Sequence, residues 1–288
     1  MLEIIDTFPA FLKYWKKAQN QSLDEQIEGW EKVYMTPWPE LLAKQLDNYE
    51  ADKLDWRKIA RVKVFPHFSK QIPAMREAHK NLLESCVPLY ERVQHLFDFN
   101  SDVIVVIYVG IGCGAGWVTP YRDTPAILFG LENIAECDWS NVSDIQELIA
   151  HEAGHLVHQY WRSQNGKSAG SGPWWQLYEE GFAQRIESKI CSEYTWHQAD
   201  ELMDSDWLEW CQRHKGWLAA EFLKRIGEAK SVAPFFGSWF NINGKIETGY
   251  FLGHEVITEL EKNISIKEIA LFDDIEGYLK PILKQMMP

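Results

Sequence analysis

One segment of the chain, DIQELIAHEAGHLVHQYW from Asp144 to Trp161, constrains the possible folds more than any other. Its apolar residues recur at helical spacing, it contains no proline, and Ser143 before it is the expected N-cap. The segment therefore predicts an amphipathic helix. His151 and His155 are four residues apart, so a helix places both imidazoles on one face.

This arrangement predicts a metal site with Zn²⁺ as the cofactor. Two neutral imidazoles on one helical face can bind one zinc ion, and Glu152 beside the first of them can act as general base for a water molecule there. The pattern His151-Glu152-x-x-His155 is the HExxH signature of zinc peptidases. Because the pattern supplies only two ligands, a third must come from elsewhere in the chain.

Composition restricts the class of protein. The 288 residues are 46% hydrophobic and 25% charged, as in an ordinary soluble globular protein with a substantial core. The net charge of −13 and the lack of a basic patch argue against a nucleic-acid partner. Five scattered cysteines without a CxxC pair argue against a disulfide framework. The chain shows neither a signal peptide nor an apolar run of membrane-spanning length, so we expect a cytoplasmic protein without a membrane partner.

The order of patterns along the chain predicts three regions. Residues 1–100 show helical periodicity interrupted by prolines, which predicts an N-terminal helical region. Residues 101–162 contain two expected strands, VIVVIYV from Val103 and AILFG from Ala126, and then the zinc-binding helix. Residues 163–288 begin with a Gly/Ser-rich loop and continue as a helical C-terminal region, with helices expected at 174–190, between 196 and 230, and from Gly249. The three regions can also form one continuous catalytic domain.

Two glycine-containing patterns do not support nucleotide binding. The run GIGCGAG at 110–116 formally matches a dinucleotide-binding fingerprint, but Pro120 and Pro125 prevent the helix that must follow it. We expect a glycine-rich turn or a flexible active-site loop there instead. Gly166-Lys167-Ser168 resembles the end of a phosphate-binding loop, but Trp161 stands where that loop needs its first glycine.

The third zinc ligand distinguishes the classes of HExxH protein, because a catalytic zinc usually has three protein ligands. A metzincin would have glycine and histidine where this chain has His158 and Trp161, so that class is excluded. HEAGH also occurs in membrane-anchored ATP-dependent proteases. Those proteases need an ATPase module and a membrane segment, and this chain shows neither, so we do not expect that class. Glu179 and Glu180 remain, and only one can face the metal because neighbours on a helix diverge by about 100°. We expect His158 to orient or pack rather than to bind the metal.

The stretch WWQLYEEGFAQ, which contains both glutamates, resembles the gluzincin aminopeptidases and their thermolysin-like relatives. In that family the glutamate just before Gly-Phe-Ala is the third zinc ligand, which implies Glu180 here, whereas Glu179 replaces the usual asparagine. The resemblance implies an α+β, thermolysin-like zincin, mostly helical with a small sheet next to the HExxH helix. The spacing from His155 to Glu180 is longer than in the aminopeptidases, which indicates a different branch.

The resemblance implies two further site residues. GLEN at 130–133 is similar to the Gly-Ala-Met-Glu-Asn motif whose glutamate binds a free amino terminus, so Glu132 is a candidate for substrate binding, the alternative being a polar strand end. The preceding strand could pair with an extended peptide at its edge. Gluzincins stabilise the oxyanion with a Tyr or His, here Tyr250 at the start of a helix or His254 one turn later. Tyr250 could instead be a packing residue.

These patterns together predict a zinc-dependent peptidase, a hydrolase in which Glu152 is the general base, and aminopeptidase activity is one form of it. The GYFLG stretch from Gly249 also resembles poorly characterised bacterial zinc-dependent proteases, and that likeness covers roughly residues 100–260. The expected partner is a peptide or small-protein substrate, while endo- or exopeptidase activity, side-chain specificity and oligomeric state stay open. The alternative is a zinc-containing binding or regulatory protein with a catalytically silent zincin fold.

Overall fold

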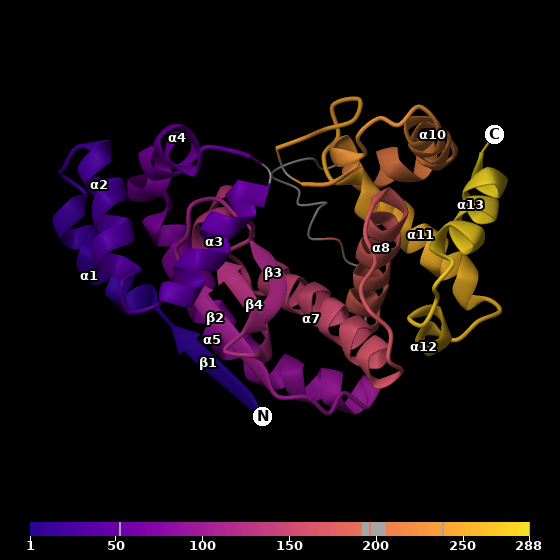
Figure 1. Ribbon diagram of the computed structural model, residues 1–288, viewed down its shortest axis with the longest axis horizontal. Helices are drawn as coiled ribbons and strands as arrows, with labels where there is room; N and C mark the ends of the chain where they lie inside the picture. The colour runs from indigo at the N-terminus through magenta and orange to yellow at the C-terminus, as the bar shows by residue number, and fades with distance from the viewer. Residues whose placement is uncertain (52, 192–195, 197–205, 238, 288) are drawn as a thin grey trace. The chain divides into compact units, whose positions relative to one another are not determined.

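The computed structural model describes residues 1–51, 53–191, 196, 206–237 and 239–287 (Figure 1). Contacts divide the chain into two compact units. The first contains residues 1–91 and 100–149, and the second contains residues 92–99 and 150–288. Two of the three divisions fall within helices, one in α5 (Phe68–Phe97) and one in α7 (Val142–Gln164). His151, His155 and Glu180 therefore all belong to the second unit.

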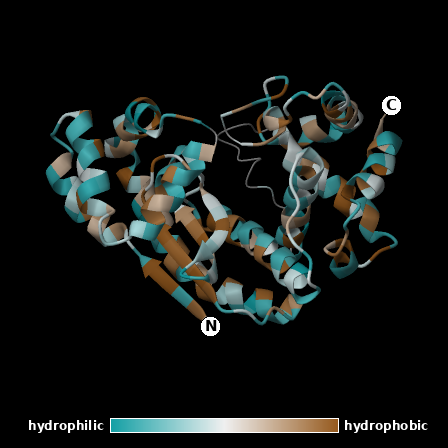
Figure 2. Cartoon of the chain, in the orientation of Figure 1, coloured by the Kyte–Doolittle hydropathy of each residue, from teal (hydrophilic) through white to brown (hydrophobic). Residues whose placement is uncertain are grey.

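A four-stranded mixed sheet lies in the first unit, in the order β1-β2-β4-β3. The strands are β1 (Leu2–Asp6), β2 (Val103–Tyr108), β3 (Gly116–Tyr121) and β4 (Thr124–Gly130). β1, β2 and β4 are parallel, and β3 is antiparallel to β4. Every residue of β2 is buried, as its β-branched sequence predicts, and Figure 2 shows its hydrophobic colour. β2 and β4 confirm the two predicted strands.

The sheet differs from the sequence prediction at both edges. Residues 2–6 form a strand, although the N-terminal region was expected to be helical; five residues are too few for periodicity to distinguish the two. Residues 116–121 form β3, a strand that the sequence did not predict, and Pro120 is tolerated there because β3 is an edge strand. β4 is paired on both sides, so the prediction that this strand offers an edge to a peptide was wrong.

The remaining elements of the first unit are helices packed through aromatic side chains. Ser22 and Glu25 form a capping box at one helix start. Phe11 packs against Tyr34 and Phe68, with ring centroids 5.4 Å and 5.5 Å away. The helices of this unit other than α5 and α7 are α1 (Phe8–Ala18), α2 (Leu23–Gly29), α3 (Pro39–Ala51), α4 (Trp56–Ile59) and α6 (Leu131–Glu136), with π-helical turns at Trp30–Tyr34 and Ala60–Val64 and a 3₁₀ turn at Phe65–His67.

The helix that carries the HExxH motif is capped two residues earlier than predicted. α7 begins at Val142, and the side-chain oxygen of Asn141 accepts a hydrogen bond from the backbone N–H of Asp144 at 3.1 Å. Ser143, the predicted N-cap, lies inside the helix and donates its hydroxyl to Glu147 at 3.0 Å. Asn caps a helix as well as Ser does, so the sequence alone did not distinguish the two positions.

The described part of the second unit is helical, which confirms the prediction for the C-terminal region. Residues 197–205 of the helical stretch expected from 196 to 230 lie outside the described residues. Within the described part of the chain, no helix is both long and apolar enough to cross a membrane. No disulfide joins the five cysteines. The helices are the C-terminal part of α7, α8 (Pro173–Ile190), α10 (Trp207–Gly227), α11 (Thr248–Glu261), α12 (Ile266–Ile269) and α13 (Ile275–Met286), with a 3₁₀ turn at Ala233–Phe235. The protein is thus mostly helical with a small mixed sheet, consistent with an α+β fold.

Candidate metal centre

Three side chains from two helices converge in the second unit. His151 and His155 project from α7 and Glu180 from α8, and their ligand atoms all lie within 4.8 Å of one another. Glu180 Oε2 is 3.3 Å from His151 Nε2 and 3.4 Å from His155 Nε2. Two ligands of a tetrahedral zinc, each about 2.0–2.1 Å from the metal, are about 3.3 Å apart. The donor types, and the two distances from Glu180 to the imidazoles, therefore fit a zinc ion.

The neighbouring glutamate has a different partner. Glu179 accepts a hydrogen bond from the indole N–H of Trp175, one turn earlier on α8, at 2.7 Å. The two carboxylates diverge as neighbours on a helix must. The structure thus brings Glu180, and not Glu179, to the histidines.

The charges at the centre favour a cation. Burial alone would lower the pKa of His151, but the carboxylates of Glu180 and Glu187 raise it to about 10. Burial alone would raise the pKa of Glu180, but His155 and His151 hold it well below its usual range. The carboxylates that favour a protonated imidazole here would equally favour a divalent cation held by the neutral imidazoles.

Glu187 is a candidate site residue that the sequence analysis did not identify. It is completely buried on α8, and its Oε2 lies 3.3 Å from His151 Nδ1. A carboxylate at Nδ1 holds the proton on that nitrogen and leaves Nε2 to bind a metal. The available signal was spacing: Glu187 follows Glu180 by seven residues, which is two helical turns and hence the same face.

The small residues of both motifs allow the helices to approach. A Cβ atom at Gly154, in HEAGH, would lie 2.8 Å from the Cα of Ala183, in the Gly-Phe-Ala stretch of α8. A Cβ atom at Gly181 would lie 2.2 Å from the carbonyl carbon of Gly253 on α11. The backbone of α8 therefore contacts α7 on one side and α11 on the other. This close packing is what brings a side chain as short as glutamate within reach of both imidazoles.

The other predicted catalytic residues also lie in the second unit. Glu152 is buried on α7 next to the first histidine. The ring of Tyr250, at the start of α11, is 5.6 Å from that of His151, and Phe236 packs against it at 5.8 Å. His254 is buried instead against Trp196, with ring centroids 5.1 Å apart. The structure therefore places Tyr250, rather than His254, beside a metal-ligand candidate.

Glu132 lies in the first unit, in the first turn of α6 rather than at a strand end. It is buried, and its two carboxylate oxygens accept hydrogen bonds from the backbone N–H groups of Gly110 at 2.7 Å and Gly112 at 3.2 Å. Burial raises the pKa of Glu132 to about 7. The glycine-rich loop is thus held by this side chain, and its amine-binding role stays a prediction.

Glu132→Gln is expected to remove a pH-dependent loss of stability. Since burial raises the pKa of Glu132 from an ordinary 4.5 to about 7, the folded protein retains a proton that the unfolded chain releases. As the pH rises from about 4.5 to about 7, the free energy of unfolding of wild type should fall relative to that of the variant. Below about pH 4.5 the difference between the two free energies should stay constant. Urea unfolding of both proteins at about pH 4, 5.5 and 7 measures it. Parallel stability curves over this range would contradict the expectation.

No family model matches the chain, and no curated protein or solved structure matches it either. The function is therefore inferred from the residues of this chain themselves.

Glu180→Ala and Glu179→Ala form a matched pair of neighbouring substitutions. We expect Glu180→Ala to weaken zinc binding at least about 100-fold, because it removes one of three ligands, and Glu179→Ala to weaken it less than about fivefold. Competition with a chromophoric chelator measures both affinities. Equal losses in the two variants would mean that Glu180 is not a ligand.

Glu187→Gln is expected to weaken zinc binding by about 10-fold or more, within the range typical of groups that orient a metal-bound histidine. The amide keeps the size of the side chain but lacks the charge that holds the proton on His151 Nδ1. The same chelator competition measures the affinity, and Glu255→Gln on α11 is the control. An affinity equal to that of wild type would remove Glu187 from the site.

Proposed function

We propose that the protein is a zinc-dependent peptidase, a gluzincin of the thermolysin-like type. The observation that carries this proposal is the convergence of His151, His155 and Glu180, whose ligand atoms lie within 4.8 Å of one another, with Glu180 3.3 Å and 3.4 Å from the two imidazoles. Glu152, adjacent to one ligand on the same helix, completes the set of groups that peptide hydrolysis requires. The resemblance of HEAGH and EEGFA to gluzincin motifs supports the same class.

Each residue has a defined task in this proposal. His151, His155 and Glu180 would hold the zinc ion, which when bound supplies a Lewis acid for the scissile carbonyl and acidifies water. Glu152 accepts the proton of the attacking water and delivers it to the leaving nitrogen. The phenolic hydroxyl of Tyr250 donates a hydrogen bond to the oxyanion that develops on the carbonyl oxygen.

Metal analysis and a matched pair of peptides test the proposal. Protein purified without chelator should contain about one zinc per chain and should hydrolyse peptides from a broad library. A good substrate is then compared with its N-acetylated form: loss of cleavage on acetylation, together with a weaker Glu132→Ala variant, would identify an aminopeptidase. Unchanged cleavage of the blocked peptide would identify an endopeptidase. Zinc at one per chain without any hydrolysis would favour a zinc-containing binding protein, and the absence of zinc would overturn the proposal.

A further inference from the structure

The face of α7 that carries the metal-ligand candidates continues beyond them. His151, His155, His158 and Arg162 follow at spacings of four, three and four residues, which places them on one helical face. α8 runs along this face in the opposite direction, since His151 meets Glu187 near one end of α8 and Arg162 meets Trp175 near the other. The metal centre and Arg162 are thus two parts of a single contact between the helices.

The guanidinium of Arg162 is buried and connects three segments of the chain. Its Nε and Nη2 donate to the carbonyl of Ser168, in the loop before α8, at 3.0 Å and 2.7 Å. Its Nη1 donates to the carbonyls of Ala270 and Phe272, after α12, at 2.9 Å and 2.8 Å. The group also lies 4.8 Å from the centroid of the Trp175 ring. Only the planar fork of an arginine can reach acceptors on both sides in this way.

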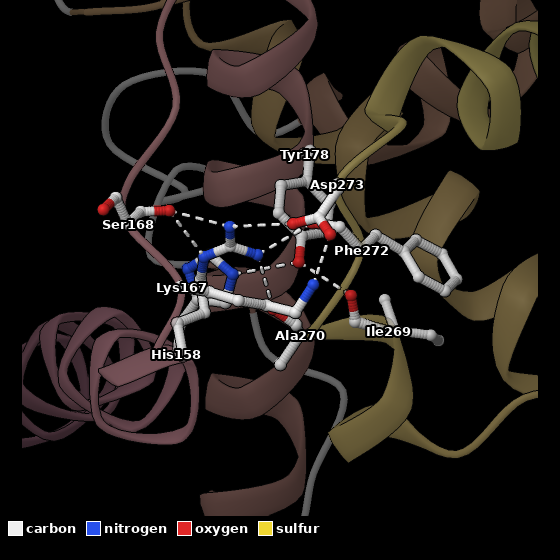
Figure 3. Close-up of polar contacts among 9 residues, drawn as sticks. His158, Lys167, Ser168, Tyr178, Ile269, Ala270, Phe272 and Asp273 are labelled. Carbon is white, nitrogen blue, oxygen red and sulfur yellow. Dashed lines mark hydrogen bonds and ion pairs between the residues drawn. The ribbon is translucent and has the colours of Figure 1, made fainter. Parts of the chain in front are cut away.

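A second chain of hydrogen bonds runs parallel to the first (Figure 3). The hydroxyl of Tyr178, on α8, donates to the carbonyl of Ile269 at 2.7 Å. Because that hydrogen is already used, the contact of 2.9 Å between His158 Nε2 and the hydroxyl assigns the donor hydrogen to His158. Burial and the charge of Arg162 hold the pKa of His158 well below its usual range, so the imidazole is neutral.

These contacts lead back to the third ligand through Trp175. The ring that packs under Arg162 donates its N–H to Glu179, the residue next to Glu180. Arg162 therefore holds both the loop that precedes α8 and the first turn of α8. From these contacts we propose that Arg162 is a positioning residue, which fixes Glu180 for metal binding by anchoring α8 to the segment 269–273. The inference rests on the proposed zinc site.

Zinc binding is sensitive to such anchoring because a ligand displaced by a few tenths of an ångström no longer meets tetrahedral geometry. The backbone contact at Gly154 fixes the separation of α7 and α8 but does not by itself fix the position of α8 along its own axis. Hydrogen bonds at the Arg162 end supply that restraint. Metal affinity should thus depend on a residue that does not contact the metal.

Five variants test the inference: Arg162→Leu, Arg162→Lys, Tyr178→Phe, Asp273→Asn and Leu218→Ala. Zinc affinity is measured by chelator competition, and the visible spectrum of the Co²⁺-substituted protein reports ligand geometry. We expect Arg162→Leu to weaken zinc binding by about 10- to 100-fold and to alter the Co²⁺ spectrum, and Tyr178→Phe to act in the same direction by a few-fold. Arg162→Lys should restore only part of the affinity, because an ammonium cannot reproduce the fork.

The controls separate positioning from general destabilisation. Asp273 is largely exposed, and its carboxylate is 3.8 Å from Arg162, so Asp273→Asn should leave zinc affinity within about twofold. Leu218 is buried on α10, so Leu218→Ala opens a cavity and lowers stability without changing a residue that bonds to Arg162 or Tyr178. The folded Leu218→Ala protein should therefore bind zinc as wild type does. If Arg162→Leu does not fold, the zinc affinities and Co²⁺ spectra of Arg162→Lys and Tyr178→Phe test the inference instead. Wild-type affinity and spectrum in the folded Arg162 and Tyr178 variants would overturn the inference, whereas failure of wild type itself to bind zinc would instead overturn the proposed function.

Discussion

Glu152→Gln is expected to lower kcat for peptide hydrolysis by about 10²- to 10⁴-fold while the protein still contains about one zinc per chain. The amide has the size of the carboxyl group and can accept hydrogen bonds, but it cannot take a proton from water at neutral pH. The position is buried on α7 beside His151. Initial rates on one peptide substrate, with metal content measured on the same samples, check the expectation.

The control for this substitution is Glu255→Gln. Glu255 is also a partly buried helical carboxylate, and it pairs with Lys215 on α10 at 3.0 Å, so its loss should leave kcat within a few-fold of wild type. A Glu152→Gln variant as active as wild type would exclude Glu152 as the general base. Loss of zinc from that variant would show instead that the substitution disturbs the metal centre.

Gly181→Ala is expected to reduce the free energy of unfolding by about 3 kcal/mol or more. Adding atoms to a packed interior usually costs about 1–3 kcal/mol, and here the new methyl group would meet the backbone of Gly253 rather than a flexible side chain. Since α8 would have to move, the Glu180 contact with the histidines should also be lost, with a corresponding decrease in zinc affinity. Urea unfolding and chelator competition measure the two effects.

Gly227→Ala provides the matched control. Gly227 ends α10, and nothing lies within 4 Å of a Cβ atom added there. The same substitution should therefore leave the free energy of unfolding unchanged or raise it by about 0.4–1 kcal/mol, because alanine restricts the unfolded chain. If Gly181→Ala behaved like Gly227→Ala, α8 and α11 would not be in the backbone contact described above.

The sequence contained the local part of the candidate site but not its surroundings. The apolar periodicity of the segment predicts the α7 helix. The four-residue spacing of His151 and His155 then places both on one face of that helix. The choice of Glu180 over Glu179 needed the resemblance to known motifs, because helical geometry states only that one of them can face the metal. The hydrogen bond from Trp175 to Glu179 supplies the physical reason.

What the sequence could not supply depends on contacts between distant segments. β1 pairs with β2 across about a hundred residues, and no local pattern in LEIID indicates such a partner. The role of Glu187 required knowing that α8 runs antiparallel to α7. Arg162 likewise looks like an ordinary basic residue in the last turn of a helix until the carbonyls of Ala270 and Phe272 are placed around it.

The backbone contacts of α8 have a consequence for any attempt to change the metal. With Ala183 against Gly154 on one side and Gly181 against Gly253 on the other, α8 cannot move closer to α7 or to α11 to suit a different ligand length. In Glu180→Asp the carboxylate would be one methylene shorter, and the backbone of α8 could not move closer to compensate for that loss of reach. The reach of the side chain at position 180 thus sets the size of the ion that this pair of helices can hold, and a redesign of metal preference would have to begin with the glycines.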